Sequence, residues 1–82
     1  MRPERIQALL RTRPFRPLRI CTTDGAKFEV RHPEQVIVSH WDVFIGLEPD
    51  PATGLWNRIE ICSPLHIVRV ERIRSPRLPR AE

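Results

Sequence analysis

The chain has 82 residues, of which 40% are hydrophobic and 29% are charged. This length suffices for one small domain, and the composition is ordinary for a soluble globular protein and excludes general disorder. No apolar run approaches the roughly 18–20 residues of a membrane span, and the first residues lead into no signal-peptide core. We therefore expect a cytoplasmic protein without membrane contact, with one domain over residues 1–74 and an extended or disordered basic tail over residues 75–82.

Basic residues gather at the two ends of the sequence. Residues 1–19 hold six arginines against one glutamate, and residues 69–82 hold five arginines against two glutamates, whereas residues 20–68 are mildly acidic. Guanidinium groups suit phosphates and carboxylates alike, so these ends suggest contact with nucleic acid or with an acidic partner. A solvated surface is the alternative interpretation. The candidate contacts are Arg11, Arg13, Arg16, Arg72 and Arg74.

Residues 3–13 form the one helical pattern of the chain. Ile6, Leu9 and Leu10 fall on one face at helical spacing. Pro3 suits a first helical position, and Pro14 cannot continue a helix because it lacks the backbone donor. A helix this short is expected to be stable only when it docks on the rest of the fold.

From Leu18 onward the hydrophobic period changes to two, which predicts strands. Asp24-Gly25 predicts a hairpin with a type I′ turn, and residues 48–57 read as a loop. Residues 63–66 predict a single helical turn with Ser63 as its cap. The expected strands lie at residues 18–23, 27–31, 36–38, 43–47, 57–62 and 68–71.

Five or six short antiparallel strands in so few residues must curl, because a flat sheet of this size buries too little. We therefore expect a mainly β fold, a small SH3-like or Sm-like barrel with the N-terminal helix over one open end. An α+β sheet with the helix on one face is the alternative. The expected core consists of Leu18, Ile20, Phe28, Val30, Val36, Val38, Val43, Ile45, Ile59, Ile61, Val68 and Val70, with Ile6, Leu9 and Leu10 docking the helix.

Three short motifs carry a resemblance to a known group of sequences. They are Phe-Arg-Pro-Leu-Arg-Ile at residues 15–20, Asp24-Gly25, and Phe-Glu-Val-Arg-His-Pro-Glu at residues 28–34, and the segment 65–71 fits the same pattern. The chain resembles small uncharacterised bacterial proteins that share F-x-P-[FL]-x-[IL], D-G and [FY]-x-V-x-H-P-E. The resemblance covers about residues 8–71, and it implies no activity.

The titratable residues do not fall into a catalytic or metal-binding pattern. The three histidines, His32, His40 and His66, lack the spacing of metal pairs. Cys62 and His66 are four residues apart, but the proline turn between them favours packing over catalysis. We therefore expect no enzyme activity, no metal and no cofactor, and we expect both cysteines to be reduced thiols.

Four residues form the candidate interaction surface: Trp41, Trp56, His32 and Glu34. Both tryptophans fall at predicted loops or strand ends, where a large aromatic either covers the barrel or stays available for binding. His32 and Glu34 lie beside a predicted chain break. The most consistent function is a non-enzymatic protein-interaction or assembly module, whose partner is another protein or a second copy. The alternative is a nucleic-acid-binding barrel that uses the Arg-rich helix and the C-terminal segment.

Two features of the sequence bear on the choice of partner. Arg58 and Glu60 alternate along the expected strand 57–62, and such an alternation could pair with itself in antiparallel fashion, giving a homo-oligomer formed edge to edge or through Trp56. Nucleic-acid binding would instead require the arginines to share one face with an exposed tryptophan.

Overall fold

The structure is a computed structural model, and it describes residues 1–73. Arg74 and the expected tail at 75–82 lie outside the described residues. In chain order the elements are α1 (Pro3–Arg11), β1 (Leu18–Thr22), β2 (Lys27–Val30), the 3₁₀ turn η1 (Pro33–Gln35), β3 (Val36–Val38), β4 (Val43–Pro49), β5 (Trp56–Cys62), the 3₁₀ turn η2 (Pro64–His66) and β6 (Ile67–Arg72).

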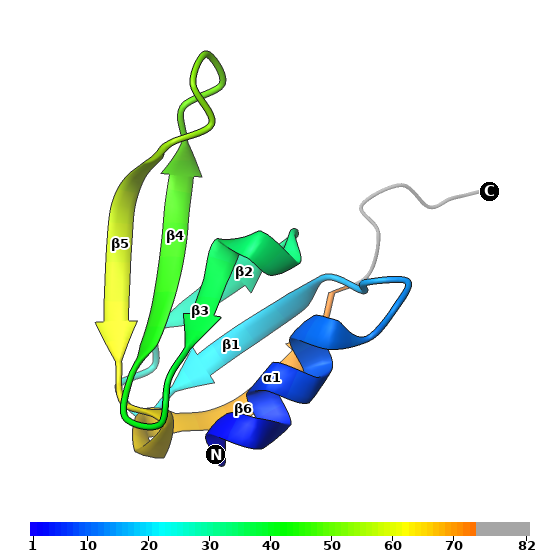
Figure 1. Ribbon diagram of the computed structural model, residues 1–82. Helices are drawn as coiled ribbons and strands as arrows, with labels where there is room; N and C mark the ends of the chain where they lie inside the picture. Colours follow the sequence, from blue (N-terminus) through cyan, green and yellow to red (C-terminus); the bar gives the residue numbers. More distant parts are fainter. Residues whose placement is uncertain (74–82) are drawn as a thin grey trace, which may run out of the picture.

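The six strands form two antiparallel sheets of three strands each (Figure 1). Sheet A has the order β2-β1-β6, and sheet B has the order β3-β4-β5. The chain passes between the sheets at η1 and η2, and both turns begin with a proline, which lacks a donor for a strand ladder. The expected mainly β fold with one N-terminal helix is confirmed, but the described strands do not close into a barrel.

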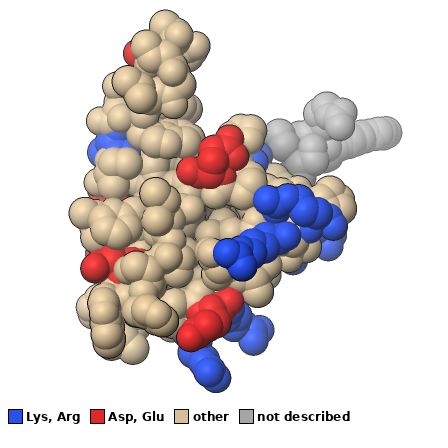
Figure 2. All heavy atoms as spheres, in the orientation of Figure 1, with Lys and Arg blue, Asp and Glu red and all other residues tan. Residues whose placement is uncertain are grey.

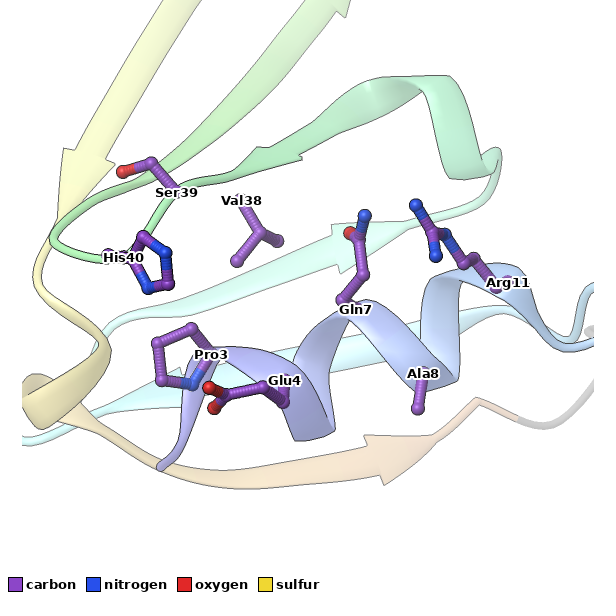
Figure 3. A pocket seen from close by; sticks show the side chains of 8 residues that line it. All are labelled: Pro3, Glu4, Gln7, Ala8, Arg11, Val38, Ser39 and His40. Carbon is purple, nitrogen blue, oxygen red and sulfur yellow. The ribbon is translucent and has the colours of Figure 1, made fainter.

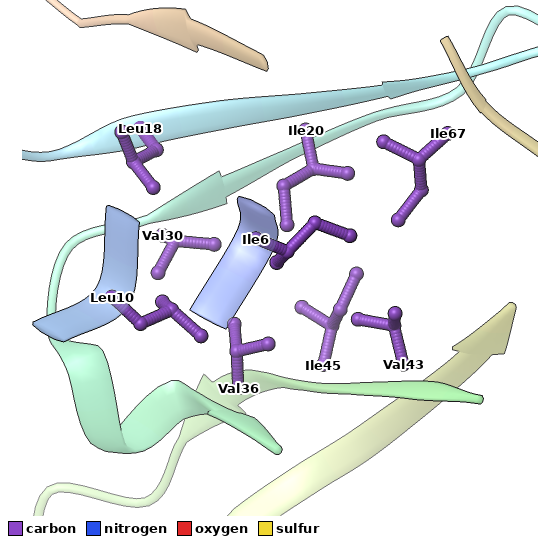
Figure 4. Close-up of a cluster of buried hydrophobic side chains, with 9 residues drawn as sticks. All are labelled: Ile6, Leu10, Leu18, Ile20, Val30, Val36, Val43, Ile45 and Ile67. Atoms are coloured by element: carbon purple, nitrogen blue, oxygen red, sulfur yellow. The ribbon is translucent and has the colours of Figure 1, made fainter. Parts of the chain in front are cut away.

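The core lies between the two sheets and α1 (Figure 4). Ile6 and Leu10 project from α1 between the side chains of sheet A and those of sheet B. Their spacing of four residues puts both on one face of the helix, which makes α1 the cover of the core. The buried apolar cluster comprises Ile6, Leu10, Leu18, Ile20, Val30, Val36, Val43, Ile45 and Ile67.

Three of the expected core residues are exposed instead. Ile59 and Ile61 are 50% and 59% exposed, because they lie on the face of β5 that points away from the core. Val68 is 60% exposed because it is the extra residue of a β-bulge. Cys21 pairs with Arg69 and Thr22 pairs with Ile67, so Val68 has no partner on β1. Three further expected core residues, Phe28, Val38 and Val70, are half-buried against the cluster.

The β1–β2 hairpin has a different turn from the expected type I′. Only Gly25 has a positive φ, of 86°, and Gly25 N–H donates to the carbonyl of Thr22 at 3.0 Å. Asp24 keeps a negative φ, and its carboxylate accepts hydrogen bonds from the Thr22 hydroxyl and from Ala26 N–H. The loop is therefore a three-residue connection with glycine in the left-handed position.

The helix is shorter than expected. α1 ends at Arg11 rather than at residue 13, because Thr12 already adopts an extended backbone.

Gln35, the last residue of η1, is buried at the corner where β2 leads into η1. Its side chain accepts from Arg31 N–H at 3.0 Å and donates to the carbonyl of Glu29 at 2.8 Å. These two bonds satisfy the backbone where the chain leaves sheet A.

Candidate functional site

The outer face of sheet A is charged. Arg19 lies on the central strand, and its guanidinium contacts Glu71 of β6 at 3.2 Å and Glu29 of β2 at 3.6 Å. Arg69 also contacts Glu71, at 3.1 Å, and Arg31 contacts Glu29 at 3.0 Å. The hydrogen bond from Arg19 holds the pKa of Glu71 below its usual range. This is the solvated face expected of an antiparallel sheet with only one face on the core.

The outer face of sheet B is apolar. Ile37, Phe44 and Ile61 lie side by side on β3, β4 and β5, and Ile59 is directly opposite Gly46. All of them point away from the core, since they alternate with the buried Val43 and Ile45. Together with the ring of Trp56 these residues form a surface that we call the outer apolar face: Ile37, Phe44, Ile59, Ile61 and Trp56.

Trp56 belongs to this face through its contact with Gly46. A Cβ added at Gly46 would lie 2.6 Å from ring atoms of Trp56, so the indole occupies the space that a side chain at position 46 would fill. Gly46 lies two residues after Phe44 and faces the same side of the sheet. The ring therefore extends the outer apolar face toward the β4–β5 turn, and it is half-buried.

The four residues of the expected interaction surface do not come together. Trp41 is 80% exposed in the turn before β4, where it lies near Met1, Pro3 and Leu65. Trp56 pairs with Pro49 at the other end of β4, roughly 20 Å away along the strand. His32 precedes η1 and Glu34 lies within it, both exposed. The sequence-based surface is therefore three separate places rather than one.

The expected basic contacts do gather at one end of the molecule. Arg11, Arg13 and Arg16 are exposed at the end of α1 and in the segment after it. Arg72 pairs with Leu18, and Ile73 N–H donates to the carbonyl of Pro17 at 3.1 Å, which brings the end of β6 beside that segment. Figure 2 shows basic side chains there and a second basic group at the lower edge of the view, whereas the surface over β4 and β5 is mostly uncharged.

We call these four exposed arginines, Arg11, Arg13, Arg16 and Arg72, the basic cluster. The exposed Trp41 lies at the opposite end of α1 from the basic cluster. Trp41 and Met1 line the same hollow, so Trp41 sits by the start of the helix. Glu34 lies near Arg11 and Arg13 instead, in a shallow depression between α1 and η1. Glu34 is therefore the acidic neighbour of the cluster, whereas the aromatic residue within the segment after α1, Phe15, is half-buried against the core.

A groove of about 510 Å³ runs between α1 and the end of β3 (Figure 3). Pro3, Gln7 and Arg11 border it on the helix side, and Val38 and His40 border it on the other. Its walls mix apolar groups with polar and titratable ones, among them Glu4 and His40. Sequence reasoning did not anticipate this groove, because it arises from the packing of α1 on β3.

A smaller hollow brings together the residue pair that could suggest nucleophilic chemistry. Cys62 and His66 both line it, beside Thr23 and Asp24 of the β1–β2 hairpin. Burial raises the pKa of the Cys62 thiol, and the charges of nearby carboxylates raise it further, so the thiolate is disfavoured. His66 Nδ1 is 3.3 Å from the hydroxyl of Thr23. This arrangement gives a weak nucleophile.

The described part of the chain has neither a metal-ligand cluster nor a membrane-spanning helix. Among residues 1–73, His, Cys, Asp and Glu side chains form no group of three or more that could hold a metal ion. None of the described helices has the length and apolar character needed to cross a bilayer. No family model, curated protein or solved structure matches the chain, so its resemblance to the small bacterial proteins stays a prediction.

Proposed function

We propose that the chain is a non-enzymatic protein-interaction or assembly module that binds through the outer apolar face of sheet B. One observation carries the proposal: sheet A covers its outer face with ion pairs, while sheet B leaves Ile37 67% exposed and Ile61 59% exposed. Contiguous apolar surface of this kind marks protein-binding sites in small proteins. Aromatic groups such as Trp56 supply large contact area at low entropy cost.

The surroundings of the face agree with a protein partner. No charged side chain stands between Ile37, Phe44 and Ile61, which lie directly opposite one another across the three strands. Depletion of charge at the centre and polar groups at the rim are the usual composition of an interface. Arg58 points to the other side of β5, where it pairs with Glu48 at 3.0 Å, so it places no charge on the outer apolar face.

A finer fold assignment belongs to the same proposal. We infer an SH3-like or Sm-like arrangement, supported by the central position of β1 between β2 and β6 and by the β3-β4-β5 meander. A cytoplasmic location is supported by the two free thiols, Cys21 and Cys62.

A nucleic-acid clamp is the second candidate function. Its support is the basic cluster, whose four arginines are all exposed at one end of the molecule. It ranks second because base stacking on an aromatic platform is what retains single strands, and Trp41 lies at the other end of α1. Arg13 also directs its guanidinium to the carbonyls of Leu10 and Thr12, at 2.8 and 3.0 Å.

Site-specific photo-cross-linking in living cells tests the leading proposal. A photoreactive residue replaces Ile37 in one chain and Lys27, exposed on the outer face of sheet A, in a control chain. We expect covalent protein adducts from position 37 and a background level from position 27. Equal yields from both positions would overturn the proposal.

A further inference from the structure

We propose that two copies of this chain associate by antiparallel pairing of their β5 edges about a two-fold axis at Ile59, joining the two B sheets into one sheet of six strands. This inference goes beyond the proposed function, because it uses the edge of sheet B and not the centre of its outer face. The two ideas can therefore fail separately.

The edge of β5 is the least protected sheet edge in the described chain. β5 has seven residues, and it is hydrogen-bonded to β4 on one side only (Figure 1). Its register with β4 is regular, and Trp56–Cys62 contains neither proline nor lysine. Long, regular edges without these devices present unpaired N–H and C=O groups to other chains.

The other three sheet edges carry protection that β5 lacks. β3 has only three residues and lies against α1. β2 has four residues, begins with Lys27 and is followed by the turn at Pro33. β6 is irregular, because a bulge interrupts its pairing with β1. Self-association through a strand edge is therefore expected at β5.

Charge and strand length together favour one register for the pair, because an axis at Ile59, the middle residue of β5, pairs all seven residues. A two-fold axis perpendicular to the sheet places the outer faces of both copies on the same side of the joined sheet. The axis must then lie at a residue of β5, and each permitted register corresponds to a different residue on the axis. With the axis at Ile59, Arg58 of each copy lies opposite the partner's Glu60. Moving the axis to Arg58 or to Glu60 puts two arginines or two glutamates directly opposite each other, which is destabilising.

The faces of the strand agree with this register. Arg58 and Glu60 point to the same side, where the Arg58 guanidinium is already 3.0 Å from Glu48 and 3.6 Å from Glu60 of its own chain. The cross-copy pairs would extend this cluster, and they contribute register more than affinity because these side chains are about half exposed. On the other side, Ile59 meets the partner's Ile59, and the two outer apolar faces become continuous.

Sedimentation velocity of the purified full chain over a wide concentration range tests the proposal. We expect a species of two chains, each of 9.6 kDa. Arg58→Glu and Glu60→Arg each place like charges opposite one another in the proposed register, and each is expected to weaken the dimer about tenfold or more. Circular dichroism checks that both variants are folded.

Mixing the two variants gives the sharpest result. The Arg58→Glu chain carries two acidic side chains and the Glu60→Arg chain two basic ones, so a heterodimer in this register has opposite charges at both pairs. We expect the mixture to dimerise although each variant alone does not. Arg5→Glu and Glu34→Arg, which make the same charge changes at exposed sites on α1 and η1, are the controls and should leave the dimer unchanged.

Three results would overturn the inference. They are a single-chain mass at every concentration, masses that grow beyond two chains, and a dimer that the charge changes at positions 58 and 60 do not affect. A monomer that still forms adducts from position 37 would contradict the proposed dimer and leave the proposed function in place.

Discussion

Gly46 is the position in sheet B where the size of the side chain is most tightly limited. An added Cβ would lie 2.6 Å from the near side of the Trp56 ring, which cannot rotate away without leaving the outer apolar face. We expect Gly46→Ala to cost about 1–3 kcal/mol in urea unfolding and to shift the emission of Trp56 to longer wavelength. The emission measurement uses a Trp41→Phe background.

A second variant shows whether that cost comes from the indole. In a chain that carries Trp56→Leu, Gly46→Ala should destabilise the fold much less, because the smaller side chain leaves room for the methyl group. An equal cost in both chains would contradict the contact between Gly46 and Trp56.

Glu71 is the residue whose ionisation is most directly tied to the fold. Its hydrogen bond with Arg19 lowers the pKa of the carboxyl in the folded state, so the stabilisation is present above the unfolded pKa and is lost as the pH falls through the folded value. We expect Glu71→Gln to lower the urea midpoint at neutral pH and to reduce the fall in stability below about pH 4.5. Glu34→Gln, at an exposed site in η1, is the control for the loss of one negative charge.

The strands illustrate what alternation along a chain can and cannot reveal. β1 to β4 lie close to their expected positions, because period-two patterns bounded by Pro, Gly and Asp define strands locally. The face that each strand buries depends on the opposing sheet, which no local pattern contains. Ile59 and Ile61 were therefore assigned to the wrong side, and the bulge that buries Ile67 instead of Val68 could not be read from spacing.

The candidate site was less predictable than the fold for the same reason. The outer apolar face joins residues of three strands, and the one local signal for it was that strand 43–47 is apolar on both faces. A strand that is apolar on both faces is typical of a central strand, which β4 is, but here its second face is part of an exposed surface. The basic cluster depends on the pairing of β6 with β1, and this long-range contact carries no sequence signature.

Two isoleucines on neighbouring strands, one on each face of sheet B, test which face is buried. Ile45 is fully buried on β4, and Ile61 is 59% exposed on β5. Ile45→Ala is expected to cost about 2–5 kcal/mol because it removes transfer energy and leaves a cavity. Ile61→Ala, the matched control, should cost less than about 1 kcal/mol. Equal losses in equilibrium unfolding would show that the assignment of the faces is wrong.

At the scale of the whole molecule, charge and apolar surface are segregated. The basic cluster lies at one end, and the surface over β4 and β5 carries few charges (Figure 2). Such segregation separates the two candidate functions in space, so each can be removed without the other.

Fluorescence anisotropy of a labelled single-stranded oligonucleotide addresses the basic cluster. Because the exposed Trp41 lies at the other end of α1 from the basic cluster, we expect no change in anisotropy at low salt with tens of micromolar protein. A clamp would bind with a salt dependence of about 0.7–0.9 log units per log unit of salt for each phosphate neutralised. Binding that is lost when Arg11, Arg13 and Arg16 are all changed to Glu would reverse the ranking of the two functions.

The most direct test of binding through the outer apolar face puts a photo-cross-linker and a charge on that face in the same chain. A chain with the photoreactive residue at position 61 is compared with the same chain carrying Ile37→Glu, on the opposite side of the outer apolar face. Ile37 is 67% exposed, so the free energy of unfolding should change by no more than about 0.5 kcal/mol. We expect protein adducts from position 61 nearly to disappear while the urea midpoint stays the same, and an unchanged adduct yield in the Ile37→Glu chain would contradict binding through this face.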